Sequence, residues 1–283
     1  MPRLERCTPR PEDRLAVRES LPFFAVHGVA LVGAFVYPPT AGLLLLSVAL
    51  LWLRLLGVTL AYHRYFAHRA FRTSRFFQFV MAFWAVSSAQ KGVLWWAGHH
   101  RNHHRYSDTP QDIHSPSRRG FWWSHAGWIL CRQYNHAPLE TIRDMARYPE
   151  LRWLDRHNDV PTVAYAVLCL AIGGWPGLIW GYFINTVLLW HATFSINSLS
   201  HVFGRRRYPT TDTSRNNPWL AVLTLGEGWH NNHHYFCSAA RNGFYWWEWD
   251  PTYYAIWLLE KLGIVWDVRR PSARILAAGR PAR

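Results

Sequence analysis

The sequence is poor in cysteine, with four in 283 residues and no C-x-x-C pair among them. This excludes a disulfide framework and a thiolate metal site, and it favours a reducing compartment. Acidic residues are also scarce, with 17 Asp and Glu against 31 Lys and Arg and a formal net charge of +14. Because long apolar runs interrupt the basic residues, we expect a membrane surface or an anionic substrate and no nucleic acid.

Two other features are missing. The first twenty residues are not followed by a short apolar core with a small-residue cleavage site, so no cleaved signal is predicted. The chain holds a single Glu-x-x-His, Glu227 to His230, whereas carboxylate-bridged di-iron bundles need two such pairs and two further Glu. That design is excluded. Disorder is excluded as well, because 50% of the residues are hydrophobic and 16% are aromatic.

The long apolar runs come in two pairs. Leu21 to Tyr37 and Ala41 to Tyr62 are each close to the roughly 20 residues that cross a bilayer core. A second pair covers about 159–172 and 178–200, around a Gly-rich break. The two turns carry no Lys or Arg, while Arg-rich stretches flank the outer ends. By the positive-inside rule, the sequence predicts two hairpins, about 21–62 and 159–200, with cytoplasmic flanks.

A further apolar stretch, Phe76 to Trp96, is long enough to span but contains several polar side chains. A crossing there would place the polar regions on either side of it on opposite faces of the membrane. We therefore expect an interfacial or cap-embedded helix. The prediction is one all-α integral membrane domain over 1–283, with four transmembrane helices and a cytoplasmic helical cap at about 63–158 and 201–283.

The histidines of the predicted cap are its most specific sequence feature. The cap contains H-x-x-x-x-H at 63–68, H-x-x-H-H at 100–104 and again at 230–234, and a further His201. On a helix, positions i, i+3 and i+4 share a face, whereas His63 and His68 would lie about 140° apart and reach different metals or straddle a helix end. Chance would give about 0.05 matches to H-x-x-H-H. Nine imidazoles exceed the needs of one zinc and predict two metals, without distinguishing iron from zinc.

The order and spacing of these boxes around two hairpins resemble the membrane fatty acyl desaturases, specifically the acyl-CoA delta-9 (stearoyl-CoA) branch. Other stretches are similar to the same branch, including Gly57 to His63, Ser124 to Trp128, Ala192 to Gly204 and Gly226 to Asn231. The similarity covers roughly residues 40 to 270.

The resemblance implies two Fe²⁺ ions held by nine histidines, His63, His68, His100, His103, His104, His201, His230, His233 and His234. It also implies that Asn197 holds a metal-bound water and that Trp96, Thr193 and Phe194 lie near the bend of a substrate tunnel. The carboxylates Asp108, Asp112 and Glu227 are placed to contact ligand N–H groups. When α-helical geometry is followed back from His63, Trp52 and Leu55 either line the distal tunnel or pack against the first hairpin arm.

The activity implied is oxygen-dependent insertion of a cis double bond, at the delta-9 position, into a saturated fatty acyl chain. The chain would be carried as acyl-CoA, and the electrons would come from a separate ferredoxin or cytochrome-type donor and its reductase. We expect a bacterial inner-membrane protein in contact with lipid, with a cytoplasmic active site. Gly98-His99 replaces the Arg-Asp pair that meets the CoA head group in the animal enzymes, which leaves an acyl lipid or acyl carrier protein open.

Two alternatives remain at this point. A membrane hydroxylase of the same superfamily would use the same histidines, and only the product distinguishes it. A His-rich metal transporter would place its ligands at mid-membrane depth, inside the spanning helices.

Roles are also expected for several residues outside the histidine motifs. His114 and His125 are expected to be hydrogen-bonded cap residues, and His27 and His191 to bond neighbouring helices. Arg54, in the second apolar segment, is expected to be functional, to snorkel or to have an interhelical partner.

Overall fold

The computed structural model describes Cys7 and residues 13–279. Most of the N-terminal stretch on which the signal prediction rests lies outside this range. The longer elements are the helices α1 (Val17–Val36), α2 (Ala41–Leu56), α3 (Arg75–Val86), α4 (Val93–Tyr106), α8 (Pro149–Arg156), α9 (Asp159–Gly177), α10 (Asn185–Ser198) and α13 (Pro251–Lys261). Two π-helices, Gly57–Ala67 and Leu178–Ile184, continue α2 and precede α10.

Short elements build the rest. The short α-helices are α5 (Pro116–Arg119), α6 (Phe121–His125), α7 (Arg143–Ala146), α11 (Pro218–Leu223), α12 (His230–Tyr235) and α14 (Ala273–Ala278). The 3₁₀ turns are Gly127–Leu130, Arg132–Tyr134, Leu139–Thr141 and Leu199–His201. The strands β1 (Arg72–Thr73) and β2 (Val265–Trp266) pair antiparallel and tie the end of α13 to the start of α3.

Three helical segments are long and apolar enough to cross a membrane: Val17–Val36, Ala41–Ala67 and Asp159–His201. Their most apolar windows are only 17%, 39% and 17% buried, respectively, within the protein. Large apolar side chains such as Phe35 and Ile172 therefore project outward. A helix with a satisfied backbone and an apolar outer surface suits a lipid environment, as expected of a membrane protein.

The 43-residue segment Asp159–His201 reverses direction at Gly174, which has φ 59° and non-helical geometry. Tyr165 Oη then donates to the Gly181 carbonyl at 3.0 Å, so α9 lies antiparallel to the chain that follows it. The reversal falls inside the break expected at 173–177. Trp180 Nε1 donates to the Tyr37 carbonyl at 2.8 Å, which places both hairpin turns at the same end of the bundle.

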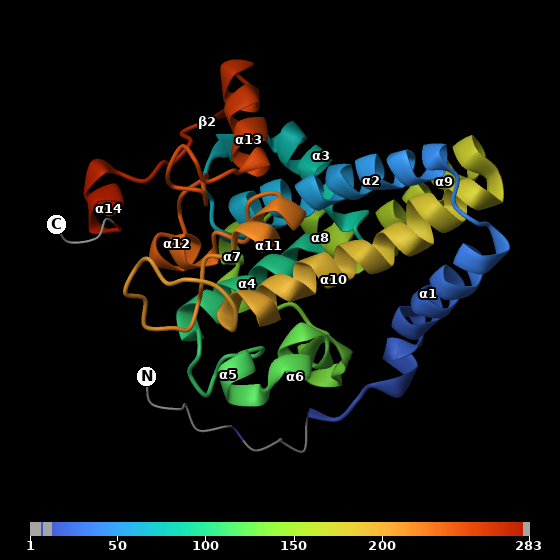
Figure 1. Ribbon diagram of the computed structural model, residues 1–283, viewed down its shortest axis with the longest axis horizontal. Helices are drawn as coiled ribbons and strands as arrows, with labels where there is room; N and C mark the ends of the chain where they lie inside the picture. Colours follow the sequence, from blue (N-terminus) through green and yellow to red (C-terminus); the bar gives the residue numbers. More distant parts are fainter. Residues whose placement is uncertain (1–6, 8–12, 280–283) are drawn as a thin grey trace.

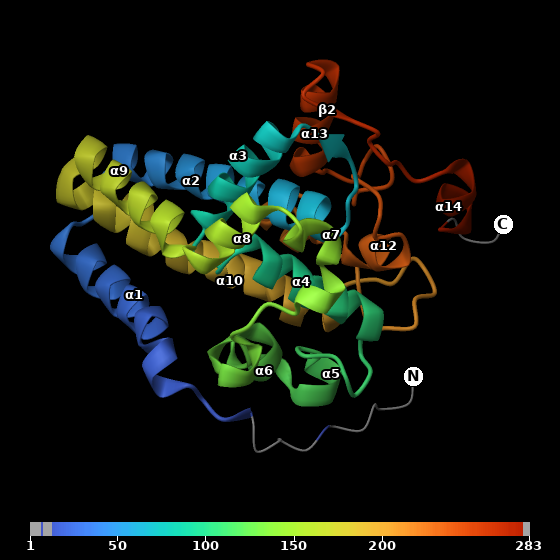
Figure 2. The same cartoon turned by 180° about the vertical axis from the view of Figure 1, so that it is seen from behind.

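The first hairpin is splayed: α1 packs on the π-helix Leu178–Ile184 and on α10. A Cβ added at Gly33 would lie 2.6 Å from Ile179, so the absence of a side chain there permits this close approach. In Figures 1 and 2, α1 runs obliquely past the bundle that α2, α9 and α10 form. Both views place the turns at one end and α4 and α12 toward the other.

One predicted segment needs correction. The stretch Phe76 to Trp96 is not one helix, because α3 ends at Val86 and α4 begins at Val93. Between them Ala89 and Lys91 have φ of 58° and 64°, values that end a right-handed helix. The helix that begins at Ala41 continues past residue 63 to Ala67.

Arg54 is buried in α2 and has interhelical partners. Its guanidinium donates to Asn185 Oδ1 at 3.0 Å and to Thr186 Oγ1 and the Ser87 carbonyl at 2.9 Å. It also lies over the Tyr165 ring, 4.5 Å from the centroid. The cation is therefore solvated by neutral dipoles from α10, the end of α3 and α9, and it does not snorkel.

Candidate metal centre and adjacent cavity

The π-helix that follows α2 places the first two histidines together. The His68 N–H donates to the His63 carbonyl at 3.1 Å, and the two ring centroids are 4.9 Å apart. A π-helix bonds i to i+5, so residues five apart lie near one another instead of about 140° apart. The expectation that these two histidines reach different metals is therefore wrong. The alternative holds, because His68 caps the helix end.

The two H-x-x-H-H motifs divide between two clusters. Their i and i+4 histidines are about 40° apart on a helix and stay together, while i+3 lies about 60° to the other side. The first group is His63, His68, His100, His104 and His233. The second group is His103, His201, His230 and His234. All nine predicted histidines thus enter two groups, each with one potential ligand atom per residue within 4.8 Å of the others.

In the first group the Nε2 atoms point at one another. The distances are 2.9 Å for His68 to His100, 3.1 Å for His100 to His104, 3.0 Å for His104 to His233 and 3.0 Å for His233 to His63. Five imidazoles exceed the four ligands of a tetrahedral site, so the group fits a metal with more than four ligands.

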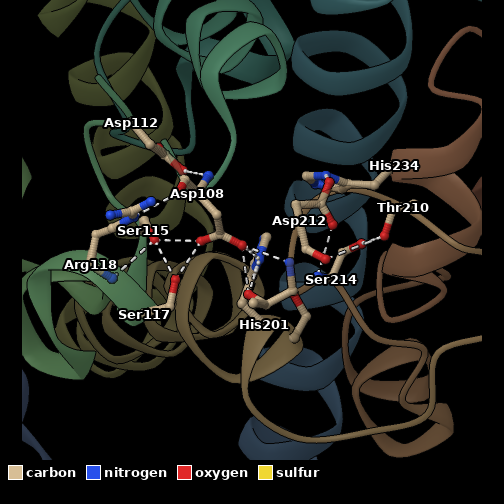
Figure 3. Close-up of polar contacts among 12 residues, drawn as sticks. Asp108, Asp112, Ser115, Ser117, Arg118, His201, Thr210, Asp212, Ser214 and His234 are labelled. Atoms are coloured by element: carbon tan, nitrogen blue, oxygen red, sulfur yellow. Dashed lines mark hydrogen bonds and ion pairs between the residues drawn. The ribbon is translucent and has the colours of Figure 1, made fainter. Parts of the chain in front are cut away.

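The second group is held from behind by carboxylates. Asp112 Oδ1 is 3.0 Å from His103 Nδ1, and Asp212 Oδ2 is 2.7 Å from His234 Nδ1. His201 Nδ1 lies 3.2 Å from Thr213 Oγ1 and 3.7 Å from Asp108 Oδ2. Figure 3 shows Asp108 and Asp212 on the two sides of His201: Asp108 accepts from the hydroxyls of Ser115 and Ser117, and Asp212 accepts from the Ser214 N–H. Such contacts fix the ring so that Nε2 faces inward, and the buried Nε2 of His234 has no hydrogen-bond partner.

The predicted carboxylates Asp108, Asp112 and Glu227 all lie beside group members, and Glu227 Oε2 is 2.6 Å from His63 Nδ1. Arg64 donates to the other oxygen of Glu227 at 3.0 Å. The sequence prediction missed Asp212. It lies in the loop after His201, 22 residues from the histidine it contacts, and no helical spacing connects the two.

The electrostatics keep most of these imidazoles neutral. Burial, followed by repulsion from neighbouring imidazoles, lowers the pKa of five of them well below the usual value: His68, His100, His104, His230 and His233. Burial alone would raise the pKa of Asp212, but the contact with His234 outweighs it and holds that pKa below its usual range. Neutral imidazole is the form that binds a metal.

Two cavities that share lining residues adjoin the first group. The inner cavity, about 40 Å³, is lined by Leu55, Val58, Thr59, His63, Trp96, His100, Thr193, Ile196, Asn197, Thr224, Glu227 and His230. The outer cavity, about 330 Å³, shares Trp96, His100, Thr193 and Asn197 and extends past Phe194 to α1. Four of the predicted substrate residues, Leu55, Trp96, Thr193 and Phe194, therefore line one cavity or both, and Asn197 lies between them.

Trp52 lies elsewhere. It is 44% exposed, contacts Trp249 at a ring-centroid distance of 6.1 Å, and lines neither cavity. The extrapolation from His63 assumed 3.6 residues per turn, whereas the helix between Gly57 and Ala67 has π geometry. Because a π-helix has more residues per turn than an α-helix, the helix face that carries Trp52 is not the face that carries the histidines.

Three of the four histidines expected to be hydrogen-bonded, His27, His125 and His191, have that role. His114 differs: it is buried and stacks on His103 at 4.2 Å, and its Nδ1 has no hydrogen-bond partner. His27 Nε2 is 3.1 Å from His191 Nε2, and His191 Nδ1 is 2.9 Å from His125 Nε2. His125 in turn lies 2.9 Å from Ser198 Oγ. These contacts connect α1, α10 and α6.

Comparison with known proteins gives the family. The fatty acid desaturase model matches residues 37–250. The chain is 40% identical to an sn-1 stearoyl-lipid 9-desaturase of Anabaena variabilis, over 76% of this chain and 79% of that protein. It is 38% identical to an sn-2 palmitoyl-lipid 9-desaturase of Nostoc sp. (strain 36), over 86% of each. It is 39% identical to the acyl-CoA 5-desaturase AL21 of Anemone leveillei, over 76% and 68%. The chain belongs to the fatty acid desaturase family.

Proposed function

We propose that the protein is an oxygen-dependent di-iron desaturase that inserts a cis double bond, at the delta-9 position, into a saturated fatty acyl chain. The observation that carries this is the convergence of nine imidazoles in two groups beside an apolar cavity. The similarity to two 9-desaturases supports the position of the double bond.

The residues present fit two metal ions. The first group would hold one and the second group the other, with Asn197 beside them to hold a water. Five imidazoles in the first group favour iron over tetrahedral zinc. Bound there, an oxygen-activating iron pair supplies the oxidant for C–H removal, with O₂, two electrons and two protons consumed and two waters released.

The chain's own residues orient the substrate and exclude water. Leu55, Val58 and Ile196 give the inner cavity an apolar wall, which suits a methylene chain. Trp96 stacks on His100 at 5.0 Å and donates to Gln90 Oε1 at 3.2 Å, so its ring has a fixed position between the cavity and the first group. Glu227 holds the His63 ring from behind.

We propose that the acyl chain is carried by a membrane lipid. Among the residues that the structure describes, Lys91 is the only Lys or Arg that lines the outer cavity, and Glu19 lines it too. Burial lowers the pKa of Lys91 to about 8. His99, where the animal acyl-CoA enzymes have a polar pair, is buried against Trp95 and Trp128. Several phosphates would need more cations than this. Acyl-CoA is the second candidate, supported by the Anemone leveillei relative.

We further propose a bacterial inner-membrane location, with four crossings, both metal groups on the cytoplasmic side, and a separate ferredoxin or cytochrome-type electron donor. The shared end of the two hairpin turns supports this arrangement. A tag inserted at 205–209 should report the cytoplasm, and a tag at 173–177 the opposite side. A non-cytoplasmic signal from 205–209 would contradict the orientation.

The test of the proposed function is product mapping. A host that expresses the protein is fed isotope-labelled saturated fatty acids, and the products in each lipid class and in the acyl-CoA pool are mapped by mass spectrometry over a short time course. A delta-9 double bond that appears first in intact lipid supports the proposal. A double bond that appears first in acyl-CoA would identify acyl-CoA as the carrier of the acyl chain. Hydroxylated products would indicate the hydroxylase.

A further inference from the structure

Helix α1 contacts the rest of the protein at its start, in its middle and at its other end. At its start, the Ala16 N–H donates to the Leu130 carbonyl at 2.8 Å. At its other end, Gly33 packs on Ile179. In the middle, His27 Nε2 meets His191 Nε2 of α10 at 3.1 Å. That central contact is the histidine latch.

The direction of the hydrogen bonds in the latch follows from its partners. His27 Nδ1 is 2.7 Å from the Phe23 carbonyl, which can only accept. A neutral His27 therefore presents an unprotonated Nε2 and accepts from His191. His191 Nδ1 then accepts from His125 Nε2 at 2.9 Å. The latch is thus one neutral hydrogen bond between α1 and α10, and a single interhelical bond of this kind is weak enough to open and close.

Cavities lie on both sides of the latch. The outer cavity reaches Phe23 and Trp190, whose rings stack at 5.2 Å directly beside it. The α1 groove, about 430 Å³, is lined by His27, Ala30, Leu31, Ala34, Trp180, Ile184, Val187 and Leu188. His27 and its neighbours thus separate an apolar groove on the lipid-facing surface from the cavity that leads to the metal groups.

The geometry points to a lateral entrance between α1 and α10. We propose that an acyl chain attached to a membrane lipid passes sideways from the α1 groove into the outer and inner cavities when the histidine latch opens. This rests on the proposed function and adds the route. Leu31 and Leu188 line the groove and are 64% and 49% exposed, so the groove faces the hydrocarbon that holds such a chain.

A crosslink across the groove tests the entrance. Leu31→Cys and Leu188→Cys are combined in a chain in which Cys7 and Cys237 are replaced by Ser, since the other two cysteines are buried. The protein is joined with a short bis-maleimide in nanodiscs of saturated lipid. We expect desaturation of lipid-linked chains to fall at least tenfold relative to either single-cysteine variant carrying the same reagent. Metal content and the thermal unfolding midpoint should be unchanged.

Two results would overturn the entrance: a fall of less than twofold, or an equal fall with acyl-CoA added from the aqueous side. The second result would mean that the crosslink distorts the site as a whole. If no variant desaturates any acyl substrate, including uncrosslinked protein with native cysteines, the proposed function itself fails.

A second readout is independent of activity. Spin labels at positions 31 and 188 report the distance between the helices, and His27→Leu removes the latch while keeping an apolar side chain of moderate size. We expect a longer and broader distance distribution than in the labelled parent. The matched control is Leu21→Ala, an exposed position on α1 outside the groove, which should leave the distribution unchanged. An unchanged distance distribution in His27→Leu would show that the histidine latch does not hold α1 against α10.

Discussion

The two histidine groups are built differently. In the first group, five imidazoles contact one another, and among the described residues only His63 is held by a carboxylate, Glu227. In the second group, His103 and His234 are each fixed by an aspartate and His201 by Thr213 with Asp108 behind it, while Nδ1 of His230 has no hydrogen-bond partner. Most of the second group is therefore oriented by the fold, whereas the first would depend more on a bound ion.

Because of this difference, the loss of a histidine and the loss of a carboxylate should weaken metal binding to different extents. Removing a ligand should affect either group severely, because no other side chain can replace an imidazole at that position. Removing a carboxylate should affect the second group in a graded way, because the ring stays but its orientation is lost.

The largest effect is expected from His103→Ala and His233→Ala, one ligand from each group. Each should lower desaturation by at least about 10³-fold and leave the protein in the membrane, because neither residue belongs to the apolar surface of the bundle. His136→Ala, at an exposed histidine outside both groups, is the control and should keep full activity. Activity above a tenth of the parent in either ligand variant would remove that residue from the centre.

Asp212→Asn should have a smaller effect, about 10- to 100-fold weaker metal affinity at the second group. The amide keeps the shape but no longer provides the negative charge that orients the His234 N–H. Metal affinity is measured by competition with a coloured chelator. Asp159→Asn, at the start of α9, is the control. Equal affinity in the Asp212→Asn variant and the parent would mean that the fold orients His234 without the carboxylate.

Chain length should respond to Leu55 and not to Trp52. Leu55→Ala enlarges the inner cavity and should shift preference toward longer saturated chains, since one methylene in an apolar pocket is worth about 1–3 kcal/mol. Trp52→Ala removes a larger side chain outside the cavity and should leave the ratio unchanged. Competition between two chain lengths, read by mass spectrometry, measures the effect. If Trp52→Ala alone shifted the chain-length ratio, Trp52 and not Leu55 would control chain length.

The smallest effect concerns pH and the metal-free protein. Burial lowers the pKa of His234 to about 4, whereas an unfolded histidine titrates near 6.5. As the pH falls below about 6.5 the unfolded state takes up the proton first, so the free energy of unfolding decreases down to about pH 4. The apparent melting temperature should drop by roughly several degrees between pH 7.5 and 5.5. A pH-independent melting temperature would contradict the burial of neutral imidazoles.

Much of this arrangement follows from local sequence. The histidine boxes have helical spacing, so their side chains can be placed on one end of α4 and α12 without tertiary information. The reversal at Gly174 lies within a Gly- and Pro-rich break, and only glycine readily combines a φ of 59° with a ψ of −155°. The family resemblance supplied the grouping of the boxes with His201.

The failures have separate physical causes. Continuous α-helical geometry was assumed where the chain forms a π-helix, which changed the relation of His63 to His68 and removed Trp52 from the tunnel. The break between Val86 and Val93 depends on two non-glycine residues with positive φ, which no composition signal marks. Asp212 is brought to His234 by the path of a loop, and loop paths are set by tertiary contacts.

The most direct test of the central claim is the metal content of the chain purified without chelators, measured by mass spectrometry for the parent and for His103→Ala and His233→Ala. The account predicts about two irons per parent chain and a loss of iron in each variant, with His136→Ala equal to the parent. Stoichiometric zinc in active protein, or two irons retained in both ligand variants, would contradict it.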